Sequence, residues 1–268
     1  PMYEAFEVNR PNATGIIQWM LNSAWPETYW QLYDSYLHPT GAFYGAKNGA
    51  RNINVIYNYG DEKVYVNNES LDVLKGKLKV SILDTLSQVV YSNEIAVDLQ
   101  SGEVTVFDDI KSHLPAQLTA YFVDLKLVNA ADEMLADNFY WLSTQPDVID
   151  PDYEHSSWVY TPNLSFTDLT YLRRLPEASV NNKVIFTDKG EWFVATVQLT
   201  NKSEVVSFFN EMTLVIDDNT PVLPVIWSDN YVSLLPNESK IIEVKVLKSL
   251  LNSKQPTIAF NTINTVVK

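Results

Sequence analysis

The chain has no cysteine and no long hydrophobic run, and each absence excludes a class of structure. Without cysteine there is no disulfide, no thiolate metal site and no cysteine nucleophile. No apolar segment approaches the ~20 residues that a membrane-spanning helix needs, so we expect no membrane insertion. Basic residues are scarce as well: 19 Lys and Arg against 33 Asp and Glu give a formal charge of −14. That balance argues against nucleic acid or an anionic membrane as a partner, because both require a basic surface.

The composition is otherwise that of a folded protein, with 46% hydrophobic and 12% aromatic residues. At 268 residues the chain is long enough for two domains of ordinary size. It begins at Pro1 without a signal peptide. We therefore expect a piece of a longer protein, whose first residues do not report the compartment.

Residues 15–47, GIIQWMLNSAWPETYWQLYDSYLHPTGAFYGAK, are unlike the rest of the chain. An apolar run over 15–21 breaks at Asn22-Ser23 and is followed by Trp25-Pro26 and a series of aromatic residues. Such a run predicts a strand buried on both faces of a parallel sheet. In α/β barrels the active-site residues lie just past the ends of these strands, which is where Asn22 and Trp25 lie in the sequence.

The flanking residues extend this prediction to residues 1–50. Residues 2–9 have a helical face and are ended by Arg10-Pro11, while residues 39–50 are weakly helical. One helix, one strand and a closing segment are too little to build a sheet. We therefore interpret residues 1–50 as a remnant of a (β/α)8 barrel, its last helix/strand unit.

From residue 51 the hydrophobic pattern changes to the period of two that marks half-buried antiparallel strands. About seven such segments, with turns between them, fit an immunoglobulin-like β-sandwich over residues 51–145. The predicted strands cover residues 53–57, 63–66, 77–82, 94–99, 103–107, 121–127 and 138–142.

Residues 146–162 hold several prolines and acids and predict a linker. A second sandwich of the same class is predicted over residues 163–268, with strands in 192–199, 207–216, 222–228, 241–247 and 256–267. The fold class is therefore mainly β, with two immunoglobulin-like β-sandwich domains after the barrel remnant. The tetrapeptides 136–139 (ADNF) and 228–231 (SDNY) are similar but lie at different phases of the two blocks, so they do not establish a repeat.

The segment GIIQWMLNSAWP resembles the end of the catalytic barrel in glycoside hydrolase family 2, and most resembles its exo-β-D-glucosaminidase branch. The β-mannosidase branch has an Asp where Ser23 stands here. Two further segments resemble the family's terminal domain: Trp158-Val159-Tyr160-Thr161-Pro162 with Asp168-Leu169, and Ser228 to Tyr231 with Leu234-Leu235-Pro236. The resemblance spans nearly the whole chain.

The resemblance implies a retaining glycosidase whose two catalytic carboxylates lie about 5–5.5 Å apart on earlier barrel strands. Both positions precede Pro1, so we expect no catalytic residue here and no glycoside hydrolysis by this chain alone. Its own acids near the barrel end are read as solvated or locally paired; they are Glu4, Glu7, Glu27 and Asp34.

Trp19, Asn22 and Trp25 are the residues that the resemblance implies for substrate binding. Tryptophan rings stack on the C–H faces of sugars and amides bond hydroxyl groups. The alternatives are that Trp19 is a core residue and that Asn22 only forms a loop. For Trp25, substrate binding and a structural role are equally supported. The helix-like spacing of Tyr29, Trp30, Tyr33 and Tyr36 favours packing.

The remaining motifs predict neither a metal nor a cofactor. His38, His113 and His155 are scattered, which favours exposed or lightly paired imidazoles, and Asp108-Asp109 and Asp217-Asp218 are typical of turns. Asn-x-Ser/Thr tripeptides begin at Asn12, Asn68, Asn163, Asn201 and Asn237 and indicate only polar turns.

Two functions therefore remain open. The favoured one is the C-terminal portion of a chitosan-degrading exo-enzyme, with a carbohydrate substrate, the upstream barrel as partner and β-mannosides as the alternative substrate. The other is a carbohydrate-binding or spacer module, for which an aromatic platform would be needed; Phe122, Tyr160 and Trp192 are dispersed and look structural. The resemblance suggests an extracytoplasmic location.

A detached barrel remnant would expose apolar surface. We therefore expect residues 1–50 to pack on the first sandwich or on a second copy of the chain.

Overall fold

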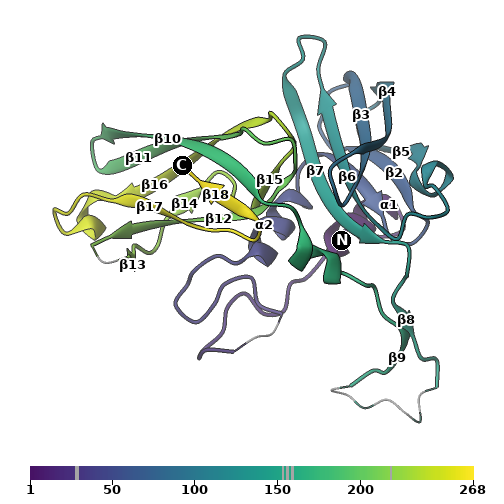
Figure 1. Ribbon diagram of the computed structural model, residues 1–268, viewed down its shortest axis with the longest axis horizontal. Coiled ribbons are helices and arrows are strands. Elements are labelled where there is room, and N and C mark those ends of the chain that lie inside the picture. Colours follow the sequence, from purple (N-terminus) through teal and green to yellow (C-terminus); the bar gives the residue numbers. More distant parts are fainter. Residues whose placement is uncertain (28–29, 153, 155–156, 158–159, 218) are drawn as a thin grey trace. The chain divides into compact units, whose positions relative to one another are not determined.

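The computed structural model describes residues 1–268 except 28–29, 153, 155–156, 158–159 and 218. The predictions on Tyr29, His155, Trp158, Val159 and Asp218 therefore lie outside the described residues. The chain is mainly β, as the sequence predicts, and forms two compact units (Figure 1). Unit 1 comprises Pro1–Arg51 and Pro176–Lys268, and unit 2 comprises Asn52–Leu175. Among the described residues, no helix has the length and hydropathy that a membrane crossing needs.

Unit 2 is a sandwich of two antiparallel sheets, in the order β1-β2-β5 and β4-β3-β6-β7. Alternate residues of these strands face inward and form one core, in which Val80, Ile82, Val123 and Leu125 are fully buried. The strands are β1 (Ile53–Asn58), β2 (Lys63–Asn68), β3 (Leu74–Asp84), β4 (Val89–Leu99), β5 (Glu103–Asp109), β6 (Ala120–Val128) and β7 (Met134–Ser143). The short helix η1 (Ile110–His113) follows β5 and buries Ile110 in the core.

All seven strands predicted for this block are confirmed. The prediction succeeds because a half-buried antiparallel strand alternates apolar and polar residues along the sequence. Two short strands, β8 (Val148–Ile149) and β9 (Asn163–Ser165), pair with each other within the segment predicted as a linker. The helix η3 (Thr170–Arg174) completes unit 2, and its Tyr171 packs against Phe122.

The sandwich of unit 1 has a five-stranded sheet in the order β14-β16-β11-β10-β18 and a second sheet in which β12 pairs with β13, β15 and β17. Its core includes Val197, Leu199, Met212 and Val244. The strands are β10 (Ala178–Lys189), β11 (Trp192–Asn201), β12 (Ser207–Ile216), β13 (Thr220–Pro221), β14 (Ile226–Trp227), β15 (Val232–Leu234), β16 (Ser239–Leu247), β17 (Thr257–Asn261) and β18 (Thr265–Val267), with η4 (Lys248–Leu251) after β16.

The predicted domain limits and the compact units differ. Residues 1–51 belong to the same unit as the second sandwich, not to that of the first, and residues 163–175 belong to the unit of the first sandwich. The division at residues 50, 145 and 162 therefore remains a prediction about the sequence.

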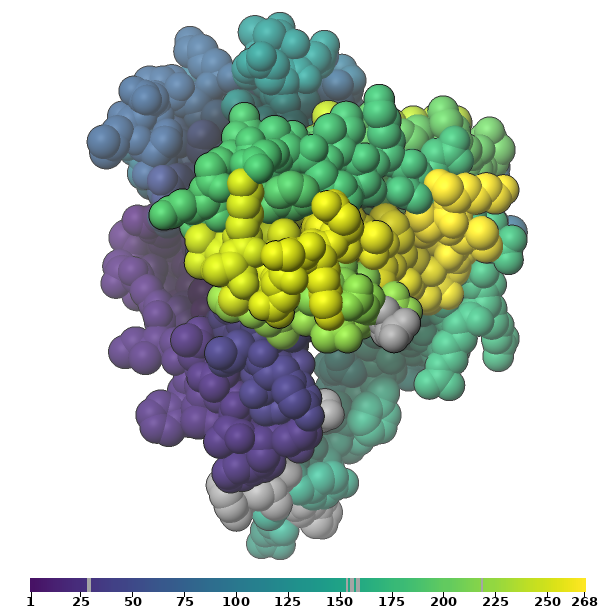
Figure 2. Space-filling model, turned by 90° about the vertical axis from the view of Figure 1, so that its left-hand side faces the viewer, coloured from purple at the N-terminus to yellow at the C-terminus, as the bar shows by residue number. Residues whose placement is uncertain are grey.

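The N-terminal segment of unit 1 contains two helices, α1 (Met2–Val8) and α2 (Gly41–Asn48), both near the predicted positions. Helix α2 contributes Tyr44 to the core of the sandwich, and Phe43 packs against that core. Figure 2 shows this segment, in purple, directly against the strands of the second sandwich, in green to yellow. Helix α2 and the sandwich thus share one core.

The buried strand predicted over residues 15–21 is wrong. The backbone there belongs to no strand and bends at residues 19 and 21, and Ile17 is 96% exposed. An apolar run becomes a buried strand only where neighbouring strands bond its backbone, and the described part of unit 1 places none beside it. The barrel remnant is not directly visible as a sheet.

The central strands of the two sandwiches follow the same order, although the ADNF and SDNY segments are not equivalent. The three-strand sets β1-β2-β5 and β10-β11-β16 correspond, as do the sets β4-β3-β6 and β15-β12-β17. A short helix follows the third strand of the first set in both cases, η1 after β5 and η4 after β16. The fold is therefore repeated within the chain.

A buried asparagine stands at the same place in each repeat, at the end of β2 (Asn68) and of β11 (Asn201), and both are 0% exposed. In each, the side-chain NH2 donates to three backbone carbonyls and the oxygen accepts from a serine two residues on. For Asn68 the partners are Asp72, Leu99 and Gln100 with Ser70; for Asn201 they are Val205, Leu234 and Leu235 with Ser203. We call this arrangement the asparagine clamp.

Candidate functional site

The candidate site is the segment from Trp19 to Thr40, because it carries all three residues for which substrate binding is predicted. Backbone hydrogen bonds fold it back on itself. The carbonyl oxygen of Leu21 accepts from the backbone N–H groups of Leu32 (3.1 Å) and Tyr33 (2.9 Å), and Asn22 and Tyr33 form a parallel bridge. Thr40 donates to the Leu32 carbonyl through both its N–H (3.1 Å) and its hydroxyl (2.9 Å). The two ends of the segment are thus tied to its middle.

A tight turn over residues 34–38 presents His38. The Asp34 carboxylate oxygen Oδ1 accepts from the N–H groups of Tyr36 (2.8 Å) and His38 (2.9 Å), and the Asp34 N–H donates to the His38 carbonyl (3.1 Å). Leu37 completes the turn with a φ of 63°, a conformation uncommon outside glycine. Asp34 is therefore a locally bonded acid, as predicted.

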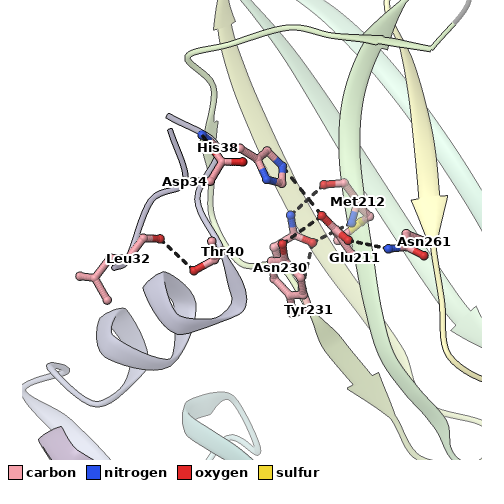
Figure 3. Close-up of polar contacts among 9 residues, drawn as sticks. All are labelled: Leu32, Asp34, His38, Thr40, Glu211, Met212, Asn230, Tyr231 and Asn261. Atoms are coloured by element: carbon pink, nitrogen blue, oxygen red, sulfur yellow. Dashed lines mark hydrogen bonds and ion pairs between the residues drawn. The ribbon is translucent and has the colours of Figure 1, made fainter. Parts of the chain in front are cut away.

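His38 faces a polar cluster on the second sandwich (Figure 3). Its Nε2 lies 3.9 Å from Oε1 of Glu211 on β12. The same Oε1 accepts from the Tyr231 hydroxyl (2.9 Å), and Oε2 accepts from Nδ2 of Asn261 on β17 (2.9 Å). Burial, followed by the nearby Glu211 carboxylate, raises the pKa of the Tyr231 hydroxyl well above its ordinary value, so Tyr231 is a donor at neutral pH.

Asn230 holds the backbone next to this cluster through its side-chain amide. Its Oδ1 accepts from the N–H of Met212 (2.8 Å) and its Nδ2 donates to the Met212 carbonyl (2.8 Å). The amide thus bonds β12 as a neighbouring strand would, which fixes the backbone beside Glu211 and Tyr231. No sequence pattern assigned a site role to these residues, although Ser228 to Tyr231 did contribute to the family resemblance.

Aromatic packing fixes the other end of the segment. The ring of Tyr33 lies 4.9 Å from that of Phe43, and the ring of Tyr44 lies 5.7 Å from that of Tyr231. The Lys47 ammonium group, at the end of α2, donates to the carbonyls of Trp227 (3.1 Å) and Ser228 (2.6 Å). Helix α2 is thereby held on the sandwich at both ends.

Trp19, Asn22 and Trp25 are all exposed, with fractions of 75% for Trp19 and 65% for Trp25. The interpretation of Trp19 as a core residue is therefore wrong. Asn22 donates a local bond, from Nδ2 to the Ser23 carbonyl (3.2 Å), and the residue is exposed. Of the neighbouring aromatic residues, Tyr33 packs against Phe43, as predicted, while Trp30 and Tyr36 are 49% and 70% exposed.

The other acidic residues of the N-terminal segment are buried or paired with a neighbouring group. Glu27 accepts from Gln31 (3.0 Å), and Glu4 lies 3.2 Å from the Pro1 ammonium group. Glu4 and Glu7 are buried and not solvated. Among the described residues, no group of three or more His, Asp or Glu could hold a metal ion.

His113 is a paired imidazole, as predicted. Its Nε2 lies 2.7 Å from Oδ1 of Asp108, and its ring stacks on Tyr91 at 3.7 Å between ring centres. Phe122 is fully buried, which excludes it from a surface platform.

Comparison with known protein families first shows which class of domain the two sandwiches belong to. Residues 60–145 match the family model of the mannosidase Ig/CBM-like domain, and residues 158–265 match that of the exo-β-D-glucosaminidase Ig-fold domain. With the repeated sandwich fold, these matches make the chain a pair of immunoglobulin-like domains of the kind found in glycoside hydrolases.

The relatives narrow the class. Over 97% of its length the chain is 34% identical to an exo-β-D-glucosaminidase of Streptomyces avermitilis, and over 90% it is 35% identical to that of Hypocrea jecorina. It spans 29% and 28% of these two proteins. The chain is similar to the immunoglobulin-like C-terminal part of exo-β-D-glucosaminidases of glycoside hydrolase family 2.

Solved structures agree. The exo-chitosanase CsxA of Amycolatopsis orientalis superposes with a TM-score of 0.88 at 29% identity, covering 98% of this chain and 31% of that one. A β-D-mannosidase from Dictyoglomus thermophilum shares the fold, with a TM-score of 0.66 at 17% identity, covering 99% of this chain and 28% of that one.

Proposed function

We propose that this chain is the C-terminal region of a retaining exo-β-D-glucosaminidase that removes terminal β-linked glucosamine from chitosan-type oligosaccharides. The observation that carries the proposal is the similarity to exo-β-D-glucosaminidases along 97% of the chain. The catalytic carboxylates come from the part of the longer protein that precedes this chain. Residues 1–50 close its catalytic barrel and the two sandwiches brace it.

Trp19, Asn22 and Trp25 border the sugar site in this proposal. The exposed indole rings offer faces for sugar C–H groups, and the amide oxygen of the exposed Asn22 accepts from a hydroxyl or an ammonium group. The net charge of −14 supports an amino sugar as substrate, because an acidic protein attracts a polymer whose amino groups are protonated.

The exposed apolar residues of this segment are the surface on which the preceding barrel strands pack. Ile17, Leu21 and Met20 belong to a run that no strand of unit 1 pairs with. Burial of such side chains stabilises by ~1.5–3 kcal/mol each. Sedimentation of this chain alone is expected to show self-association, and that of the longer protein is not.

The direct test uses the longer protein that contains this chain, assayed on p-nitrophenyl β-D-glucosaminide and on the corresponding β-mannoside. We expect hydrolysis of the glucosaminide, and no hydrolysis by residues 1–268 alone. Trp25→Ala and Asn22→Ala are expected to lower kcat/KM about tenfold or more. Tyr36→Ala removes an equally exposed aromatic ring from the same segment and is the matched control.

Preference for the mannoside would reassign the substrate. An inactive longer protein, together with strong retention of residues 1–268 in affinity electrophoresis on chitosan, would favour a carbohydrate-binding module instead.

A further inference from the structure

A single carboxylate of the second sandwich joins the sandwich to the segment that carries the candidate sugar-binding residues. Glu211 is largely buried, with 18% of its side chain exposed, and both of its oxygens accept hydrogen bonds from the sandwich itself. Asn261 is its direct cross-strand neighbour in the β12–β17 pair, and Tyr231 approaches from the segment before β15. The carboxylate is therefore held in one orientation before it meets His38.

The path from Glu211 to Asn22 is short. His38 is bonded to Asp34 by two backbone groups, and Tyr33, the residue before Asp34, donates to the Leu21 carbonyl. Asn22 follows Leu21 directly. Hydrogen bonds of the 34–38 turn and of the Tyr33–Leu21 pair thus connect His38 to the backbone next to Asn22.

The backbone at Gly41 packs closely against the second sandwich. A Cβ atom on Gly41 would lie 3.2 Å from the ring of Phe209 and 3.7 Å from that of Tyr231. Glycine at position 41 lets the chain approach these rings, and the Tyr231 hydroxyl then reaches Glu211. One tyrosine therefore contributes both to the aromatic packing under α2 and to the orientation of the carboxylate (Figure 3).

We propose that Glu211 is a positioning residue of the sugar site: with Tyr231 and Asn261 it positions His38, and through the 34–38 turn it sets the position of Asn22. The terminal sandwich thereby takes part in substrate binding without touching the substrate. This inference rests on the proposed function for its catalytic readout, and on the structure alone for its conformational one.

The test compares Glu211→Ala, Glu211→Gln and Glu243→Ala in the longer protein. Gln keeps the shape and one acceptor oxygen, and Glu243 is an exposed carboxylate on β16 that serves as the matched control. Glu211→Ala is expected to raise KM for the glucosaminide about tenfold while kcat changes less than about threefold, since binding and not chemistry is disturbed. Glu211→Gln is expected to restore most of the affinity.

Amide hydrogen exchange reports on the segment independently of activity. In Glu211→Ala the N–H groups of Tyr33 and His38 are expected to exchange at least about tenfold faster, while those of β11 and β16 stay protected. Unchanged exchange at Tyr33 and His38 would refute the positioning role. Faster exchange with an unchanged KM would refute its link to substrate binding.

A glucosaminide-inactive wild-type protein would contradict the proposed function. The exchange experiment would then still decide whether Glu211 holds the segment.

Discussion

At the scale of single residues, the two asparagine clamps show how a polar side chain can organise a β-sandwich core. Each amide satisfies three carbonyls at the point where a strand ends and a turn from another hairpin arrives. The turns are equivalent as well: Gly102 and Asn237 adopt φ values of 77° and 61°, and Glu103 and Glu238 each accept from a backbone N–H three residues earlier at 2.8 Å. The same solution is therefore used twice.

Asn68→Ala and Asn201→Ala are expected to destabilise their own sandwich by about 2–4 kcal/mol each. The loss comes from carbonyl groups left without a donor in a buried place, and not only from the missing bonds. Denaturant unfolding followed by fluorescence would measure it.

Lys202→Ala is the control for Asn201, because Lys202 is the exposed neighbour within the same tripeptide. Losses below about 0.5 kcal/mol for the asparagine variants, the range of ordinary surface changes, would contradict the role of the clamp.

At the scale of elements, glycine permits one close approach between strands of unit 2. Gly76 lies on β3, and a Cβ atom there would stand 2.4 Å from the backbone oxygen of Val128 on β6. A backbone atom cannot move aside as a side chain can. Gly76→Ala is therefore expected to destabilise unit 2 by ~1–3 kcal/mol, as overpacking does.

Thermal or denaturant unfolding would test this, with Gly60→Ala as the control in the same unit. A Cβ on Gly60 would meet only the Asn58 side chain at 3.6 Å, an ordinary contact. Equal free energies of unfolding for the two variants would contradict this prediction, because they would show that β3 and β6 can move apart with little loss of stability.

The elements also show what the sequence can predict. Strands with alternating burial, such as β3 and β12, were predicted because period-two patterns arise wherever one face meets a core. Strand β10 was missed, since beyond Val180 none of its residues is buried and its pattern carries little signal. The apolar run over 15–21 gave a strong signal but a wrong prediction. A hydrophobic sequence shows that side chains favour burial, and it does not show whether neighbouring strands are present to bury them.

The site was predictable in part. Asn22 and Trp25 follow from the resemblance, and their exposure agrees with a binding role without testing it. Glu211 and His38 are 173 positions apart by their numbers, and no local pattern connects them. Their proximity depends on residues 1–51 joining the second sandwich, which only the three-dimensional structure reveals.

At the scale of the whole molecule, the chain has 15 tyrosines, of which Tyr44 in unit 1 and Tyr57, Tyr121 and Tyr140 in unit 2 are buried. Burial raises the pKa of Tyr57, Tyr121 and Tyr171 in unit 2 and of Tyr44 and Tyr231 in unit 1. Burial and a bond to Asp61 raise the pKa of Tyr65 to about 12.

These pKa shifts predict alkaline unfolding of both units. A raised tyrosine pKa keeps the hydroxyl neutral in the folded state, while the unfolded state ionises above its ordinary pKa of about 10. The stability contributed by each group is therefore complete below pH ~10 and falls as the pH rises further. Tyrosinate absorbance should show exposed tyrosines titrating first and the buried ones ionising together with the loss of circular dichroism.

Phenylalanine at position 121 is the matched variant, because the hydroxyl is removed and the ring stays. Tyr121→Phe is expected to shift the alkaline transition of unit 2 upward. Independent, non-cooperative ionisation of all tyrosines in folded protein would contradict the prediction.

The asparagine clamps have a consequence for how the chain is produced. Asn68-Glu69-Ser70 and Asn201-Lys202-Ser203 are also tripeptides that the glycosylation machinery of a eukaryotic secretory pathway reads while the chain is still unfolded. A glycan on either amide nitrogen would occupy the atom that donates to three carbonyls, so a chain modified there could not close that sandwich. Folding and glycosylation compete for the same two atoms, and a host that lacks this modification removes the competition.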